Sequence, residues 1–200
     1  MRPAPALILA STSGARRAVL EGVGVAFEAA RPGVDEDAVK DELLAKGAAP
    51  KAVAQALAER KALAVSKGRP GLVVGADQTL DLDGRLYDKA PDLAAARSRL
   101  AELRGRTHQL HSAVAAAEDG RTVWAETVSA TLTMREFSDA FLDDYLAREG
   151  EAALGSVGCY RLEGMGVQLF EAIDGDYFTI LGLPLMGLLE LLRARGVLRA

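Results

Sequence analysis

The stretch Leu72-Val73-Val74-Gly75-Ala76-Asp77-Gln78-Thr79 (residues 72–79) places a compact apolar run directly before a carboxylate. An apolar run of about 4–8 residues bounded by polar or turn residues is typical of a buried strand. We therefore predict a strand over residues 72–76 that ends in a polar loop at Asp77. In α/β proteins such a loop lies in the crevice at the carboxyl end of the sheet, where sites are assembled. Asp77 is thus a candidate either to hold a cation and orient a water molecule, or simply to cap a turn.

The segments around this run alternate between strand and helix patterns. The apolar residues 7–10 predict a short strand, and the small polar residues after them predict the cap of a helix from about residue 15 to 21. Further helices are predicted over 50–67, 91–103, 138–148 and 184–196, and a hairpin of two strands over 108–117 and 122–134. Because no linker, repeat or low-complexity tract divides this order, we predict one α/β domain with a mixed central sheet over residues 5–198.

Composition limits the partners of this 200-residue chain. It has 24 Lys and Arg residues against 28 Asp and Glu residues, a net charge of −4. That balance excludes a broadly basic surface of the kind that holds a nucleic acid duplex by its phosphates. The apolar runs are too short to span a membrane and the start of the chain is not a convincing signal peptide, so a cytoplasmic protein is expected. Any anion must therefore be bound by a local cluster of cations.

The single cysteine and the two histidines exclude two further kinds of site. Cys159 has no second cysteine with which to form an internal disulfide, and one cysteine with two histidines cannot make an ordinary structural zinc site. We expect Cys159 to be a small buried apolar residue. We expect no catalytic role for His108 or His111.

Residues 11–17, Ser-Thr-Ser-Gly-Ala-Arg-Arg, lie where the first predicted strand leads into a helix. Free backbone N–H groups and the positive end of the helix dipole meet there, so Arg16 and Arg17 are each disfavoured by about 0.3–1 kcal/mol. A bound phosphate would reverse that sign, and arginine would add forked hydrogen bonds to it. The alternative is a solvated arginine pair on an ordinary capped helix. The segment is not a Walker loop.

Other charged residues stand in positions where charge is unexpected. Lys61 falls on the helix face that also carries Leu57 and Ala64, so it either snorkels or meets a ligand. Lys89 comes just before a predicted helix. In the glycine-rich segment 158–166, Glu163 either accepts hydrogen bonds from a nucleobase edge or is a turn residue. With Glu36 and Asp77 as candidate metal or water ligands, these cations together predict a site for a nucleotide polyphosphate.

Eight segments, in order over about residues 7–197, give the chain a resemblance to the Maf family of nucleoside triphosphate pyrophosphatases. They are LILASTSGARR (7–17), VDE (34–36), AERKA (58–62), VGADQ (74–78), KAP (89–91), LRGRTH (103–108), YRLEG (160–164) and LGLP (181–184). The resemblance implies an α/β fold akin to that of inosine triphosphate pyrophosphatase, with a nucleotide cleft beside a mixed sheet. It implies hydrolysis of the α–β phosphoanhydride of a nucleoside triphosphate to monophosphate and pyrophosphate, with a divalent cation (Mg²⁺ or Mn²⁺).

The resemblance also implies a role for particular residues. Asp77 matches the general base of the family. Glu36 matches an acid that lies on the metal side or orients the water, and Asp77 is implied as a second metal ligand. The phosphate-contacting positions are matched by Ser11, Arg16, Arg17, Lys61 and Lys89. The chemistry agrees, because cations offset the charge on the polyphosphate and on the leaving pyrophosphate while a carboxylate takes a proton from the attacking water.

Three positions bear on the choice of base. Gln78 and Glu163 resemble the branch of the family that acts on 7-methyl-GTP, whereas the pyrimidine-nucleotide branch has Thr and Gln there. A carboxylate suits the N–H donors of guanine and the positive charge of its methylated ring. Ala15 departs from that branch, which often has a tryptophan able to stack the base, and Lys89-Ala90-Pro91 departs from the usual Lys-Pro pair.

Two other functions and one structural question stay open at the level of sequence. The chain can be a non-catalytic nucleotide-binding regulator of septum formation and cell division, or a phosphatase that releases orthophosphate. For the enzyme, the resemblance favours removal of modified nucleotides from the cell. It also implies a homodimer, and the apolar segment 185–192 can face either a core or such a partner.

Overall fold

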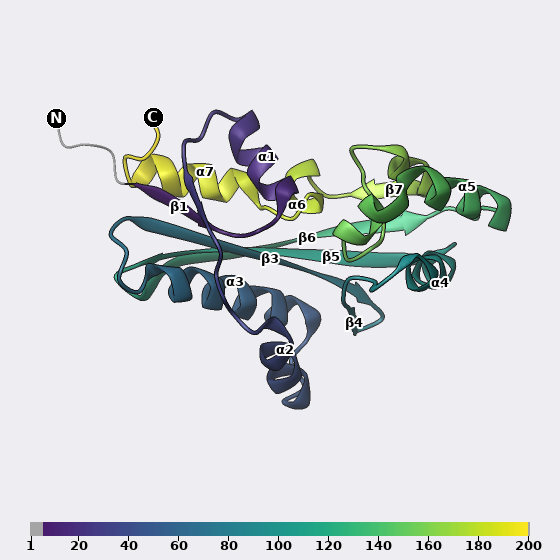
Figure 1. Ribbon diagram of the computed structural model, residues 1–200, viewed down its shortest axis with the longest axis horizontal. Helices are drawn as coiled ribbons and strands as arrows, with labels where there is room; N and C mark the ends of the chain where they lie inside the picture. Colours follow the sequence, from purple (N-terminus) through teal and green to yellow (C-terminus); the bar gives the residue numbers. More distant parts are fainter. Residues whose placement is uncertain (1–5, 200) are drawn as a thin grey trace.

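The computed structural model describes residues 6–199, so residue 5, the first of the predicted domain, lies outside the described residues. Within them, one mixed sheet of seven strands runs through the molecule in the order β2-β1-β3-β5-β6-β7, with β4 beside β3 (Figure 1). The strands are β1 (Leu7–Ala10), β2 (Glu28–Ala30), β3 (Leu72–Leu82), β4 (Arg85–Tyr87), β5 (Thr107–Glu118), β6 (Arg121–Met134) and β7 (Phe170–Asp174). Strands β2, β1 and β3 are parallel to one another, and the remaining pairs are antiparallel.

Helices cover both faces of this sheet, with α3 on one side and α1 and α7 on the other (Figure 1). The helices are α1 (Gly14–Gly22), α2 (Glu36–Ala45), α3 (Pro50–Ser66), α4 (Leu93–Leu103), α5 (Asp139–Glu149), α6 (Tyr177–Ile180) and α7 (Leu185–Ala194), with the 3₁₀ helices η1 (Gly150–Gly155) and η2 (Met165–Leu169). The side chain of the preceding residue caps several of them. The capping residues are Ser13, Asp35, Asp92, Ser138 and Asp176.

Small residues bring α3 unusually close to the sheet. Its buried alanines 54, 58 and 62 pack on the alanines 113, 115 and 117 of β5. Gly75 of β3 faces the same helix, and a Cβ atom there would lie 2.4 Å from the Ala58 carbonyl oxygen and 2.5 Å from the Ala62 nitrogen. A side chain at this position would therefore meet helix backbone that cannot swing aside.

Helix α7 faces the core. Leu185, Leu188 and Leu192 are buried in one cluster with Leu9 and Val74 of the sheet. This settles that the apolar segment 185–192 packs mainly inside the protein. No helix described over residues 6–199 is both long and apolar enough to cross a membrane.

The predicted α/β class, the first strand, the hairpin β5–β6 and the helices α1, α3, α4, α5 and α7 are confirmed. Cys159 is fully buried, as expected. The prediction that the strand ends at Ala76 is wrong, because β3 continues to Leu82. Its antiparallel partner β5 pairs with it from Val73 to Asp81, so the main chain stays hydrogen-bonded although its side chains become polar.

Two other expectations need correction on the side of α2. The charged sequence of residues 31–37 is typical of a loop and predicts one there, but Asp35 caps α2 and residues 36 and 37 are already helical. Ala64 is exposed, although its spacing predicts that it shares a buried face with Leu57. Leu57 is buried with Val39 of α2, and alanines 54, 58 and 62 face the sheet. Ala64, about two turns beyond Leu57, belongs to neither of these clusters.

Candidate active site

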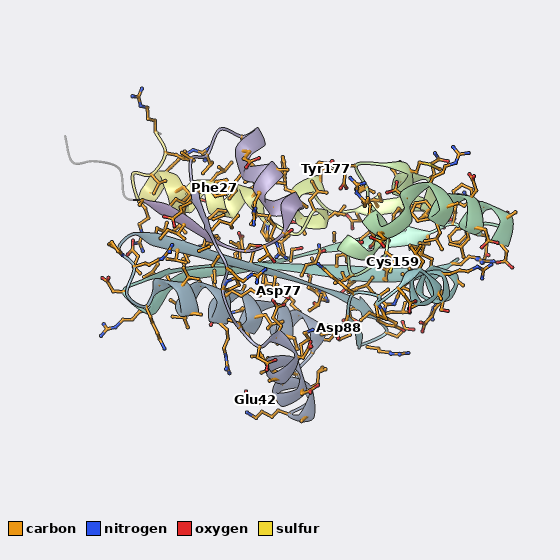
Figure 2. All side chains as sticks on the ribbon, viewed as in Figure 1. Phe27, Glu42, Asp77, Asp88, Cys159 and Tyr177 are labelled. Atoms are coloured by element: carbon orange, nitrogen blue, oxygen red, sulfur yellow. The ribbon has the colours of Figure 1, made fainter. Side chains whose placement is uncertain are left out.

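The cleft of this protein lies at a gap along one edge of β3. Strand β1 pairs with β3 as far as Gly75, and β4 begins to pair at Leu80. Between them, residues 76–79 have β5 on one side and, within the described residues, no strand on the other. A cleft of about 1180 Å³ opens there, lined by parts of α1, α2, α3, β3 and the segments after β4 and η1. Figure 2 shows Asp77 near the middle of the sheet.

Asp77, Lys61 and Glu36 form a chain of charges in this cleft. The Lys61 ammonium donates to Asp77 Oδ1 at 2.6 Å and lies 2.9 Å from Glu36 Oε2. Lys61 is 5% exposed and Asp77 is 7% exposed, so Lys61 meets carboxylates rather than snorkelling to water. Burial raises the pKa of Asp77, while Lys61 and Arg16 oppose the shift. A carboxylate with a raised pKa is suited to take up a proton.

Arg16 is aimed into the cleft from the first turn of α1. Its Nε donates to the Gly182 carbonyl at 2.8 Å, and its Nη1 lies 3.5 Å from the buried Ser11 Oγ. Burial lowers the pKa of Arg16, with the carboxylates of Asp77 and Glu36 acting in the opposite direction. For Arg16 the interpretation as a solvated surface arginine is therefore wrong.

Arg17 is not brought together with the other predicted phosphate ligands. It does not line the cleft, and its buried Nε has no hydrogen-bond partner among residues 6–199. Consecutive residues of a helix point about 100° apart, so Arg16 and Arg17 cannot both face one cleft from α1. Contact of Arg17 with a phosphate stays a prediction that its position does not support.

Two lysines complete the positive side of the cleft. Lys89 lines it, and burial together with the neighbouring cations Arg16 and Lys61 lowers the pKa of Lys89. Lys40 of α2 also lines it and donates to Asp37 at 2.9 Å and to Asp88 at 2.5 Å. Sequence reasoning missed Lys40 because it missed α2. The cap residue Asp35, followed by two acids in the first turn, is the signal that reveals this helix.

The three predicted specificity residues all line the cleft but differ in what they offer a ligand. Ala15 presents only a methyl group. The amide nitrogen of Gln78 is within 3.1 Å of Ser112 Oγ and of the carbonyls of residues 179 and 180 of α6, so it is already committed to the protein. The Glu163 side chain is 34% exposed, and its Oε1 accepts from Arg161 Nε at 3.2 Å.

The two predicted metal ligands of the cleft, Asp77 and Glu36, both pair with Lys61. Within residues 6–199 no three His, Cys, Asp or Glu side chains are grouped so as to hold a metal ion. Asp77 and Glu36, the predicted metal ligands, do lie in the cleft and share the Lys61 ammonium between them. Neither His108 nor His111 lines the cleft. His108 donates to or accepts from the Tyr160 hydroxyl at 2.8 Å, and burial lowers its pKa to about 4.

The protein is thus of the mixed α/β class, with a cation-lined cleft around one buried carboxylate, which is suited to an anionic ligand. The family model described as Maf-like protein matches residues 6–195. A nucleoside triphosphate pyrophosphatase from Caulobacter vibrioides is 64% identical over 95% of this chain and 96% of its own. A 7-methyl-GTP pyrophosphatase from Brucella abortus is 50% identical over 94% of each chain, and one from Rhizobium meliloti is 49% identical over 98% and 99%. The chain belongs to the Maf family.

Proposed function

We propose that this protein hydrolyses the α–β phosphoanhydride of nucleoside triphosphates, releasing a nucleoside monophosphate and pyrophosphate. One observation carries the proposal: the buried Asp77 lies against Lys61 in a cleft that also receives Arg16 and Lys89. Relatives that match nearly the whole chain are named as pyrophosphatases of this kind. Neither the cleft nor these relatives favour a non-catalytic regulator of cell division.

The residues of the cleft divide the reaction between them. Asp77 takes the proton from the attacking water, for which its raised pKa suits it. Arg16 offers a fork of donors to phosphate oxygens, and its Nε bond to Gly182 fixes the plane of that fork. Lys61 and Lys89 offset the negative charge that grows on the leaving pyrophosphate. The ammonium of Lys61 also lowers the pKa of Asp77, against the larger effect of burial.

The acids of the cleft fit a divalent cation that is bound with the substrate. Mg²⁺ is commonly held by one or two carboxylates together with substrate phosphates and water. Asp77 and Glu36 supply two carboxylates on either side of Lys61, and no third acid is needed. Bound there, Mg²⁺ or Mn²⁺ would neutralise phosphate charge and polarise the phosphoryl oxygen.

The proposal is tested by following the products from a panel of nucleoside triphosphates that includes GTP, UTP, TTP and 7-methyl-GTP. We expect monophosphate and pyrophosphate in equal amounts, and loss of both when EDTA removes the cation. A phosphatase would instead release orthophosphate, and a regulator would bind nucleotide without product. Either of those outcomes contradicts the proposed reaction.

For the base, we propose that Glu163 recognises guanine, with 7-methyl-GTP as the preferred member of the panel. Its carboxylate can accept from the N1–H and amino group of guanine at the open end of the cleft. We expect Glu163→Gln to raise the KM for GTP and 7-methyl-GTP about tenfold, the scale of one charge-assisted hydrogen bond, and to change that for UTP little. Glu151→Gln, an exposed change outside the cleft, is the matched control. Equal loss for every base would remove Glu163 from base recognition.

Use of the enzyme to remove modified nucleotides follows from such a substrate, and it stays a proposal. A homodimer, a cytoplasmic location and indifference to nucleic acid duplexes also stay predictions. Gel filtration and light scattering of the purified chain test the first of these.

A further inference from the structure

Two segments that follow β4 in the chain form part of the wall of the cleft. One is the loop 88–91 after β4, which carries Lys89, and the other is the segment 156–163, which carries Glu163. Asp88 and Cys159, which Figure 2 labels, mark the two segments on the side of the molecule toward α4. In the proposed function, Lys89 contacts the phosphates of the nucleotide and Glu163 contacts its base. The spacing of these two segments therefore sets how a nucleotide fits between them.

One side chain that lies outside the cleft ties these segments together. Arg99 of α4 donates from its Nη1 to the Asp88 carbonyl and to the Val157 carbonyl, each at 2.7 Å. Arg99 is not part of the cleft lining. Because its two acceptors are main-chain carbonyls, the bonds fix the backbone of each segment, and the side chains remain free to meet a ligand.

The guanidinium of Arg99 is itself held in place. It stacks over the ring of Tyr87 at 4.6 Å from the ring centre, and the Tyr87 hydroxyl donates to Glu102 at 2.5 Å. Glu102 belongs to α4 as well, so helix and ring hold the arginine between them. A flat cation on an aromatic face is an arrangement that lysine reproduces poorly.

The segment that Arg99 holds is strained at the same place. Cys159 has φ +60° although it is not glycine, a backbone conformation that persists only when surrounding contacts enforce it. The Tyr145 hydroxyl donates to the Cys159 carbonyl at 3.2 Å, and Ser156 Oγ bonds both main-chain groups of Tyr160. Arg99 joins this segment to the Lys89 loop through two carbonyls, beside a direct hydrogen bond of the Ala90 backbone with the Cys159 thiol.

We propose that Arg99 is a positioning residue that fixes the distance between Lys89 and Glu163 and so matches the cleft to a guanine nucleoside triphosphate. The inference rests on the proposed function for its substrate. The clamp, which consists of Arg99 and its bonds to the Asp88 and Val157 carbonyls, is a property of the free protein. Without Arg99, the Asp88 and Val157 carbonyls lose their shared donor, and the two segments are held together less tightly, by the Ala90–Cys159 contact and apolar packing. Substrate affinity and base discrimination then fall together, whereas Asp77 and Lys61 keep their geometry.

The experiment compares Arg99→Met and Arg99→Lys with the wild type and with Arg85→Met. Arg85 is the matched control, because it stacks over the same Tyr87 ring at 4.6 Å but bonds to neither segment of the clamp. For Arg99→Met we expect KM for GTP to rise about tenfold, as for the loss of a charged hydrogen bond, with kcat within about threefold of the wild type. The KM of Arg99→Lys should lie between those of the wild type and Arg99→Met, and the KM of Arg85→Met should match that of the wild type.

Hydrogen exchange of the free protein gives a readout that needs no activity. In Arg99→Met, amide exchange should quicken in both 88–91 and 156–163, with β3 unchanged. For Arg99→Met, three results overturn the proposed role of Arg99. They are faster exchange in one segment alone, a loss of kcat with unchanged KM, and a normal KM with normal exchange. If Arg99→Met does not fold, Arg99→Lys decides by the same criteria. A wild type without pyrophosphate release refutes the proposed function, and the exchange result still judges the clamp.

Discussion

Replacing Asp77 by Asn should lower the rate of pyrophosphate release at least about 10²-fold, the usual scale for loss of a general base. Asn has the same shape as Asp but cannot take the proton of the attacking water. The change should leave the position of Lys61 intact, because its ammonium keeps Glu36 at 2.9 Å. Steady-state release of pyrophosphate from GTP, and from the best substrate of the panel, measures the effect. Turnover at the wild-type rate would rule out Asp77 as the base.

The same variant should not destabilise the fold, which separates a catalytic from a structural role. The pKa of Asp77 is raised by burial, so the folded state binds its proton more tightly than the unfolded state does. The stabilising effect of protonated Asp77 is therefore present at pH values below the unfolded pKa, and it is lost as the pH rises through the folded pKa. Above the folded pKa the carboxylate contributes no such stability. We expect the Tm of Asp77→Asn at pH 7 to equal or exceed that of the wild type.

The pH profile and a neighbour on the same strand provide the controls. Activity should fall on acidification as Asp77 becomes protonated, at a pH above its ordinary pKa of 3.8. Asp81→Asn changes a carboxylate on the same face of β3 but outside the cleft. Asp81 Oδ1 accepts a hydrogen bond from the Gly84 N–H at the β3–β4 turn. The substitution should alter stability slightly and turnover little. A comparable loss of turnover in both variants would indicate general damage to β3 instead of loss of a base.

Replacing Gly75 by Ala should impair both stability and activity. The added Cβ would lie 2.4 Å from the Ala58 carbonyl oxygen and 2.5 Å from the Ala62 nitrogen, so α3 must move away from the sheet. Overfilling a tightly packed interior typically costs about 1–3 kcal/mol, and here the obstructing atoms are backbone. Helix α3 carries Lys61 between those two residues, so its displacement also moves the ammonium away from Asp77. A misplacement of about 1 Å can lower turnover about 10²-fold.

Urea unfolding and turnover together measure this effect. We expect the free energy of unfolding of Gly75→Ala to fall by at least about 2 kcal/mol. The matched control is Gly22→Ala in α1, where a Cβ would meet nothing within 4 Å and alanine favours the helix by up to about 1 kcal/mol. If Gly75→Ala kept wild-type stability and turnover, the close approach of α3 would not be what places Lys61.

Local sequence patterns predicted much of the fold, and they failed where distant pairing decides. The course of β3 illustrates this. Apolar residues end at Ala76, so the pattern ends the predicted strand there, yet β5 pairs with β3 as far as Asp81. That pairing joins residues about thirty positions apart, and no local window contains it. The polar residues 77–79 are part of a strand because β5 pairs with them, and Asp77, Gln78 and Thr79 line the cleft beside it.

The site was predictable to the extent that single residues stood out from their own element. Lys61 on a buried helix face and Arg16 at a helix N-terminus are such cases, and both line the cleft. Gln78 could not be assigned in this way, because the carbonyls that take up its amide belong to α6, about a hundred positions later. Arg99 shows no anomaly in sequence at all. Its role depends on two loops that only the folded chain brings within reach of one nitrogen.

The gap in strand pairing along β3 also bears on whether a strand of another chain can add to this edge of the sheet. An unpaired strand edge is a template on which another chain can add and start aggregation. Along this edge of β3 the unpaired length is residues 76–79, and β1 and β4 occupy the same side of β3 at its two ends. Lys61 and Arg16 place charge beside the opening. At this edge a foreign strand therefore finds only a short, charged stretch on which to extend the sheet, and the same gap leaves room for a small ligand.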